Sequence, residues 1–376
     1  MAAELVPNYM RGEVFANASP GMRFGMYFPT IPKDKKVDVL TGVCALNDND
    51  KKTCKAQAER QAQLFAAIPV QQGLRMAAES VAPFTTGLGN EHPLENGFAF
   101  LNPYGLPYLP GSGVKGVLRQ AARELALGDW GDSNWTDEDI EALFGHEAKE
   151  DENHLRGVLS FWDVIPQISA DKLMVEIMTP HQSHYYQDRT SPHDSGSPNP
   201  IPFLTVPPKS SFAFHVVCDL ERLPDELKQD DLWKTLLQEA FEHAFNWLGF
   251  GAKTAVGYGA LKMDENAQKT WQQRQEKAAQ TAELQSLSPN ARLVKEFILY
   301  FEQAKDAKKG KKEKPNMEAH QKARTLAKQA LEGADWTTDE KLAVANAITE
   351  WLPQVVEVDM KDERKKMKLA ALRGEA

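Results

Sequence analysis

The sequence is poor in cysteine and has no long apolar run. Three cysteines, Cys44, Cys54 and Cys218, stand among 376 residues, and no two of them form a Cys-x-x-Cys pair. This odd and scattered set supports neither a disulfide framework nor a cysteine zinc site. No apolar run approaches the roughly 18 residues that span a membrane, and residues 1–13 lack the segments of a signal peptide. We therefore expect a cytoplasmic protein with no membrane contact, and we predict no cofactor.

The sequence also lacks an excess of positive charge. Its 44 lysines and arginines are outnumbered by 53 acidic residues, so the formal net charge is −9 at pH 7. A chain of this charge is not attracted to a polyanion as a whole, and any nucleic-acid surface must be a local basic patch. The hydrophobic share of 42% is that of a globular protein, which excludes a disordered or fibrous chain.

Composition changes twice along the chain. Residues 1–69 begin with a stretch rich in proline, glycine and aromatic residues and continue into a segment of helix formers at 51–68. After residue 264 glycine almost disappears, and Ala, Gln, Glu, Lys and Leu dominate. We expect an N-terminal arm with a helix over 1–69, a central domain over 70–264 and a helical C-terminal extension over 265–376. In that extension, the face carrying Phe297 and Phe301 needs an apolar partner, predicted to be another subunit or this chain's own sheet.

The central region alternates strand and helix patterns. β-branched and aromatic residues at strand length predict strands over 74–81, 157–165, 172–178, 212–218 and 255–263. Helical periodicity appears near 114–125 and over 230–248. The order is strand, helix, strand, strand, helix, strand, with one extra strand and a long insertion at 179–206. This order predicts an α+β, ferredoxin-like domain with insertions.

Helix starts carry local signals of their own. Thr136 with Asp139 and Thr337 with Glu340 have the spacing of a capping box, in which each member satisfies the other's free amide. Ser288 followed by a proline is typical of a helix N-cap. We expect a helix after each of these three positions.

The segment PGSGVKGVLRQAAREL joins a loop to a helix. Gly111 and Gly113 remove side-chain bulk where the backbone passes close to another group, and Ser112 or Gly113 can cap a helix that begins near Val114. Free amides at such a helix start form an anion site.

The same helix carries a basic stripe. Lys115, Arg119 and Arg123 recur every four residues, so they share one helical face while apolar residues occupy another. We predict that this stripe touches phosphates. The alternative is an ordinary amphipathic helix with a solvated face, and the spacing fits both.

A second glycine-rich loop follows the later helix. GFGAKTAVGYG has four glycines in eleven positions, Gly249, Gly251, Gly257 and Gly259. The backbone must approach something closely there, with Lys253 and Thr254 as phosphate donors and Tyr258 as a stacking ring. The alternative is tight packing within the protein. Ala252 stands where a Walker loop needs glycine, so ATP or GTP binding is not expected.

The insertion at 179–206 is rich in histidine, tyrosine and proline. We favour a recognition loop in which Tyr185 and Tyr186 stack on bases and Arg189 contacts a phosphate. His181 and His184 are weak candidates for acid–base catalysis in a ribonuclease. Their spacing is unusual for a metal site, and no metal is predicted. A plain surface loop is the remaining alternative.

The two glycine-rich segments together resemble a known signature. PYLPGSGVKGVLR with FNWLGFGAKTAVGYGAL is similar to the paired motifs of the RAMP superfamily of CRISPR proteins. TTGLGNEHPLENGF, VEIMTPHQSHYYQD and PNPIPFLTV most resemble the sixth-subunit family of the Cmr, or type III-B, effector complex. The resemblance covers residues 70–263. It implies an RRM-like domain that assembles with other RAMP subunits and small helical subunits.

The resemblance also implies a function and its residues. Gly111, Ser112, Gly113, Lys115 and Arg119 match the motif that faces guide RNA, although the family commonly has serine where Gly113 stands. Gly249, Gly251, Lys253, Thr254, Gly257 and Gly259 match the glycine-rich loop. We expect a non-catalytic subunit that binds guide RNA (crRNA) near its 3′ end in antiviral defence, with target RNA as a further candidate. The alternative is a RAMP-fold endoribonuclease that processes guide RNA.

Overall fold

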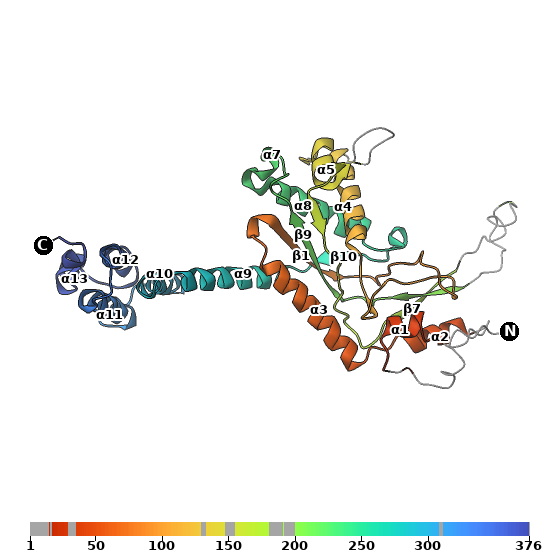
Figure 1. Ribbon diagram of the computed structural model, residues 1–376, viewed down its shortest axis with the longest axis horizontal. Helices are drawn as coiled ribbons and strands as arrows, with labels where there is room; N and C mark the ends of the chain where they lie inside the picture. The colour runs from red at the N-terminus through yellow and green to blue at the C-terminus, as the bar shows by residue number, and fades with distance from the viewer. Residues whose placement is uncertain are drawn as a thin grey trace. The chain divides into compact units, whose positions relative to one another are not determined.

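The chain folds into two compact units, residues 1–270 and 271–376. The computed structural model describes residues 15, 17–28, 35–128, 133–146, 155–179, 191, 200–307 and 311–375 (Figure 1). Each unit has a hydrophobic core of its own. Among the described residues, no helix combines the length and the apolar character that a bilayer crossing requires.

The first unit is organised around a four-stranded antiparallel sheet of order β10-β1-β9-β6. Its strands are β1 (Gly73–Ser80), β6 (Leu159–Phe161), β9 (Ser211–Cys218) and β10 (Leu261–Met263). Helix α4 (Gly111–Ala126) follows β1, and α8 (Leu232–His243) follows β9. This is the predicted order of strand, helix, strand, strand, helix, strand, with β9 inserted between β1 and β6.

One face of this sheet is packed against α4 and α8. Alternate residues of β1 and β9 are buried on it, because successive side chains of a strand point to opposite faces. The strand residues in this core are Leu74, Met76, Ala78, Phe212, Phe214, Val216 and Cys218. Each fully buried leucine or phenylalanine contributes about 2 kcal/mol, so this layer is the main source of stability in the unit.

The other face of the sheet is partly covered by α3 (Asp48–Ala66). Alanines of α3 and of the strands leave a cavity of 280 Å³ there, next to Arg75 of β1 and His215 of β9, which are directly opposite in register. Burial, helped by the charge of Arg75, lowers the pKa of His215 to about 3, so its ring is neutral. The sheet therefore has helices on both faces.

The N-terminal arm is part of the same unit. Its helices are α1 (Pro20–Gly25) and α2 (Lys36–Val43), and Phe24, Phe28 and Leu40 are buried in the same core as the strands. The Phe24 ring stacks on His92 at a centroid distance of 3.8 Å. The predicted irregular arm thus lies on the sheet domain and completes its core.

The remaining elements of the first unit are short. They are η2 (Val70–Gln72), β2 (Phe100–Leu101), β3 (Leu106–Pro107), α5 (Asp137–Phe144), β4 (Gly145–His146), β5 (Leu155–Arg156), β7 (Met174–Met178), β8 (Ile201–Thr205), α7 (Asp225–Lys228), η3 (Gln229–Asp231), the π-helix η4 (Ala244–Leu248) and η5 (Thr254–Val256). β7 and β8 form a separate antiparallel hairpin, so the predicted extra strand lies outside the main sheet. The predicted strand over 255–263 is wrong in its first half, because Gly257 and Gly259 have φ of 94° and 70° and cannot be extended.

The second unit is entirely helical in its described residues. Its helices are α10 (Pro289–Ala307), α11 (Glu318–Glu332), α12 (Thr338–Val355), α13 (Met360–Lys366) and α14 (Leu369–Leu372), and α9 (Glu265–Ser286) spans the boundary between the units. The capping boxes at Thr136 and Thr337 are confirmed, and the Ser288 hydroxyl accepts the Ala291 amide at 3.1 Å. Phe297 and Phe301 pack within this unit's own core, so the prediction that they pack on another subunit or on this chain's sheet is wrong for these two residues.

A buried ion-pair network ties α11 to α13. His320 Nδ1 accepts the Asn316 amide, so the proton is on Nε2, which donates to Glu363 at 3.0 Å. Lys366 and Arg324 also reach the Glu363 carboxylate, at 3.1 and 3.5 Å. Burial alone would raise the pKa of Glu363, but the hydrogen bonds from His320 and Lys366 outweigh it and hold this pKa below its ordinary value.

We expect Glu363→Gln to lower the free energy of unfolding by about 1–3 kcal/mol at pH 7, because it leaves buried donors without their charged acceptor. The folded-state pKa of Glu363 is depressed, so its stabilisation is complete above the unfolded pKa of about 4.3 and is lost as pH falls below it. The difference between wild type and variant should therefore shrink below about pH 4. Urea denaturation followed by circular dichroism measures it, with exposed Glu357→Gln as control. A difference that stays constant from pH 7 to pH 3 would contradict this role.

Candidate nucleic-acid interface

Helix α4 begins earlier than the sequence suggests. Its first residue is Gly111, with Pro110 in the N-cap position, so the predicted cap at Ser112 or Gly113 is wrong. The Asp163 carboxylate, from the segment after β6, accepts the Gly111 amide at 2.7 Å and supplies the cap from a distant part of the chain. The amide of Gly113 donates to the Pro110 carbonyl. The start of α4 therefore has fewer free amides than predicted.

Gly111 is required by packing inside the protein. A Cβ at this position would overlap the carbonyl oxygen of Phe161, at the end of β6. Gly113 is less constrained, because its Cβ would lie 3.3 Å from the Leu109 side chain. The close backbone approach predicted for this motif is therefore an approach to a neighbouring strand.

The basic stripe lies along the border of the buried face of α4. Val114, Leu118, Ala121 and Ala122 are buried. Lys115 and Arg119 are half-buried, and Ser112 and Arg123 are exposed. In the part of the chain that the structure describes, Arg119 and Arg123 have no carboxylate partner, and Arg119 Nε is buried without an acceptor. No carboxylate of the described residues therefore uses the hydrogen-bonding capacity of these two guanidinium groups.

Three glycines of the second loop pack against protein backbone. A Cβ on Gly251 would overlap the Thr85 carbonyl oxygen, and one on Gly259 would overlap that of Phe250. Gly249 is nearly as confined and has φ of 71°. Gly257 has open space around it, at the exposed tip formed with Ala255 and Val256. The loop is thus rigid at its base, and its tip faces solvent.

The side chains of this loop rest on the β7–β8 hairpin. Lys253 Nζ lies 5.9 Å from the centroid of the Phe203 ring, and the Tyr258 ring meets the same phenylalanine edge-on at 5.4 Å. Tyr258 Oη donates to Glu176 at 3.5 Å. The pKa of the Tyr258 hydroxyl is raised, mainly by burial and further by the charge of Glu176. The ring predicted to stack on a base therefore packs against the stem of the insertion.

The insertion beyond that stem carries the other predicted residues. Tyr185, Tyr186, Arg189, His181 and His184 lie outside the described residues. Their predicted roles remain predictions. Within the described ranges, no group of three or more His, Cys, Asp or Glu side chains is placed to hold a metal ion.

Sheet topology sets the relative position of the two glycine-rich corners. β1 and β6 each pair antiparallel with β9, so they run in the same direction, and β6 ends at Phe161, which is level with Leu74 near the start of β1. α4 starts beside the end of β6. The second loop binds the backbone just beyond β1, through Gly259 to Pro83 and Ala252 to Thr85, both at 2.8 Å. Only β9 lies between β1 and β6, which places these strands roughly 10 Å apart across the sheet, while the six-residue offset between Leu74 and Ser80 separates the two corners by roughly 20 Å along it.

Two exposed apolar residues flank the second loop and were missed from the sequence. Trp247 in η4 is 65% exposed, and Val256 in η5 is 72% exposed. A signal for Trp247 was available, because it falls outside the apolar positions at Phe241, Ala244 and Phe245 that face the core. A large exposed aromatic beside a glycine-rich loop is suited to contact a base or a partner protein.

Comparison with known proteins adds independent information. The sequence model of the RAMP superfamily matches residues 78–262, which include both glycine-rich corners. The CRISPR system Cmr subunit Cmr6 of Pyrococcus furiosus is 29% identical over 231 residues, covering 46% of this chain and 63% of that protein. Cmr6 of Saccharolobus solfataricus is 29% identical over 173 residues, covering 46% and 50%. The chain thus spans about half to under two thirds of the length of these relatives.

Solved structures were also compared. A chain of the type III-B Cmr-beta complex bound to cognate target RNA matches with a TM-score of 0.42 and 19% identity, over 62% of this chain and 71% of that one. Cmr6 from Pyrococcus furiosus matches with a TM-score of 0.29 and 26% identity, over 51% and 98%.

Two glycines of α4 give a matched test of the packing at this site. Gly111→Ala should lower the free energy of unfolding by about 1–3 kcal/mol, because the new methyl group collides with the β6 backbone. Gly116→Ala, at an exposed position of the same helix with open space around it, should raise the free energy by about 0.5–1 kcal/mol. Urea denaturation of the full chain measures both. Equal effects of the two substitutions would show that Gly111 is not confined by Phe161.

Proposed function

Since the chain belongs to the RAMP superfamily, we propose that it is a non-catalytic, RNA-binding subunit of a type III-B (Cmr) CRISPR effector complex. Its role is to hold guide RNA near the 3′ end and to assemble with other Cmr-type RAMP subunits and small helical subunits. The observation that carries this proposal is that both glycine-rich motifs lie within the matched region and pack on the backbone beside strands of one sheet.

The chemistry of the two glycine-rich corners suits a phosphate backbone. Arg119 and Arg123 present guanidinium groups, whose planar set of donors fits phosphate oxygens. Lys115 on the same stripe and Lys253 with Thr254 in the second loop add further donors. Contacts of this kind position an RNA strand without reading its sequence, as expected for a subunit that holds many different guides.

The rigid glycine bases support the same proposal. Gly111, Gly251 and Gly259 fix the two corners to the strand ends, so the cations beside them are held by well-ordered backbone. Rigid placement reduces the conformational entropy that is lost when RNA binds. The net charge of −9 does not oppose this function, because the contacts are local and the salt-screened field of distant acids is weak.

The proposed partners follow from the relatives. Both curated relatives are named as Cmr6 subunits of CRISPR systems. The exposed Trp247 and Val256 beside the second loop are suited to a protein neighbour or a base in such an assembly. Target RNA is a further proposed ligand of the assembled complex.

Substitution of cations at the two corners tests RNA binding. Lys115→Ala and Lys253→Ala should each weaken binding of a labelled single-stranded guide RNA and flatten the slope of log affinity against log salt by about 0.7. Fluorescence anisotropy of the full chain at several salt concentrations measures both. Lys262→Ala is the matched control, because Lys262 is on β10, outside both corners, and pairs with Glu79 at 3.0 Å. Slopes unchanged in both corner variants would rule out these contacts.

The non-catalytic part of the proposal has its own test. The five histidines among the described residues are structural in their placement: His92, His146, His243 and His320 bond to nearby oxygens, and His215 is buried. We expect the purified chain to leave a labelled guide-RNA precursor intact, as seen by gel electrophoresis. Cleavage that disappears in His181→Ala or His184→Ala would instead establish the endoribonuclease alternative.

A further inference from the structure

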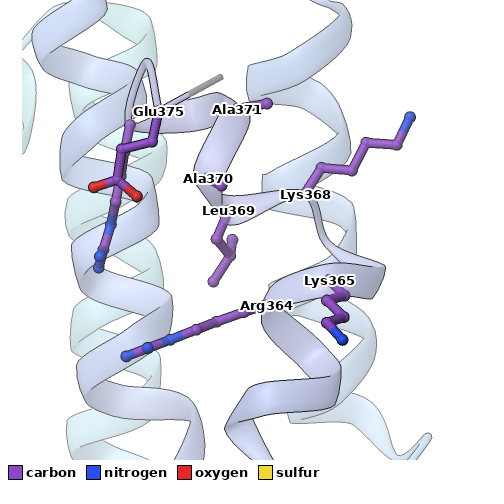
Figure 2. A pocket seen from close by; sticks show the side chains of 8 residues that line it. Arg364, Lys365, Lys368, Leu369, Ala370, Ala371 and Glu375 are labelled. Atoms are coloured by element: carbon purple, nitrogen blue, oxygen red, sulfur yellow. The ribbon is translucent and has the colours of Figure 1, made fainter.

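The helical C-terminal unit has a basic hollow of its own. Its volume is 460 Å³, and its lining residues are Arg364, Lys365, Lys368, Leu369, Ala370, Ala371, Arg373 and Glu375 (Figure 2). Four of these eight residues are cations and one is an acid, in a chain whose net charge is −9. We name this feature the C-terminal basic hollow. Nothing in the RAMP-matched region overlaps it.

A tight turn between α13 and α14 builds this hollow. Met367 and Leu369 are both buried in the core of the unit. Lys368 between them has φ of 51° and ψ of 41°, and its exposed side chain projects from the turn. The buried neighbours fix the backbone of the turn. The point from which the exposed Lys368 side chain projects is therefore fixed.

The other cations lie on both sides of an apolar floor. In Figure 2, Arg364 points to one side of Leu369, and Lys365 and Lys368 point to the other. The floor between them consists of Leu369, Ala370 and Ala371. Arg373 is fixed at the border, since its Nη2 lies 3.4 Å from Asn346 Oδ1 and 3.3 Å from Thr349 Oγ1.

The nearby buried carboxylate does not neutralise these cations. Glu363 is occupied by the buried His320 and by the more exposed Arg324 and Lys366. In the residues that the structure describes, Arg364, Lys365 and Lys368 have no carboxylate partner. Three like charges grouped on one surface repel one another, and an external anion would relieve that repulsion.

We infer that the C-terminal basic hollow binds the ribose-phosphate backbone of single-stranded RNA. Phosphates would lie against the cations on either side, and a sugar would lie on the apolar floor between them. A lone phosphate or carboxylate would leave most of a 460 Å³ hollow empty and its floor uncovered. The inference shares its ligand with the proposed function, but it depends on a different surface in the other unit.

The test is a triple variant of the full chain, R364Q/K365Q/K368Q. Its probe is a fluorescein-labelled 30-nucleotide oligouridylate, which has no stable secondary structure. Three lost phosphate contacts should flatten the slope of log affinity against log salt by about two, and lower affinity at 0.1 M salt by roughly ten- to a hundredfold. The charge-preserving variant R364K/K365R/K368R should keep the wild-type slope.

A control triple variant in the same unit has the same loss of charge. Lys322 and Lys328 on α11 and Lys341 on α12 lie outside the hollow, and K322Q/K328Q/K341Q should leave the slope unchanged. If both triple variants flatten the slope equally, the effect is one of net charge and the inference is overturned. If R364Q/K365Q/K368Q loses helical circular dichroism, the single variant Lys368→Gln at an exposed position replaces it as the test. That variant must then flatten the slope by about 0.7.

The outcomes separate this inference from the proposed function. If Lys115→Ala and Lys253→Ala flatten the slope and the triple variant does not, the hollow binds no RNA and the corner contacts stand. The reverse result supports the hollow and overturns the corner contacts. Unchanged RNA affinity with weakened assembly of the Cmr-type complex would make the hollow a protein interface and overturn the inference. No binding of RNA by the wild-type chain would overturn both.

Discussion

The insertion of β9 between β1 and β6 is the constraint on which the rest of the molecule depends. Because β1 and β6 both pair antiparallel with β9, they run in the same direction, with the end of β6 level with the start of β1. The loop after each of these ends then meets one of the glycine-rich corners. Gly111 packs on the end of β6, and Gly251 and Gly259 pack on the backbone just beyond β1. Two segments more than a hundred residues apart are thereby attached to the same sheet through backbone contacts.

The glycines at these corners are needed for packing within the protein. At Gly111, Gly251 and Gly259 a Cβ would collide with a carbonyl oxygen of a neighbouring segment, so these residues permit close packing of backbone on backbone. Packing and ligand binding are compatible, because a fixed corner holds its adjacent cations in a fixed position. Arg119 and Arg123 on α4, and Lys253 in the second loop, gain their placement in this way.

Charge is organised locally in a chain that is acidic overall. Some carboxylates are used within the protein, as the buried Glu363 is by His320 and Lys366, and the exposed Asp163 by the amide of Gly111. The cations Arg364, Lys365 and Lys368 near Glu363 face solvent. Basic surfaces arise in both units although the chain as a whole has more acidic than basic residues; residues 271–376 alone carry 20 lysines and arginines against 17 acidic residues. Screening over roughly 10 Å keeps distant acids from cancelling them.

The sequence by itself determined those features whose signals lie within one element. The capping boxes at Thr136 and Thr337, the apolar periodicity of α8 and the strand pattern of β9 were all predicted correctly, because their causes are side chains within a few residues. The order of strands and helices followed from these elements, and so did the family resemblance carried by the two glycine-rich segments. Only the tertiary structure decided the start of α4, which is capped by distant Asp163, and the partner of Phe297, which lies in its own unit. It also decided the packing of Tyr258 on Phe203 and the basic hollow around Lys368. These features depend on contacts between segments far apart in the chain, and local propensity carries no information about which segments will meet.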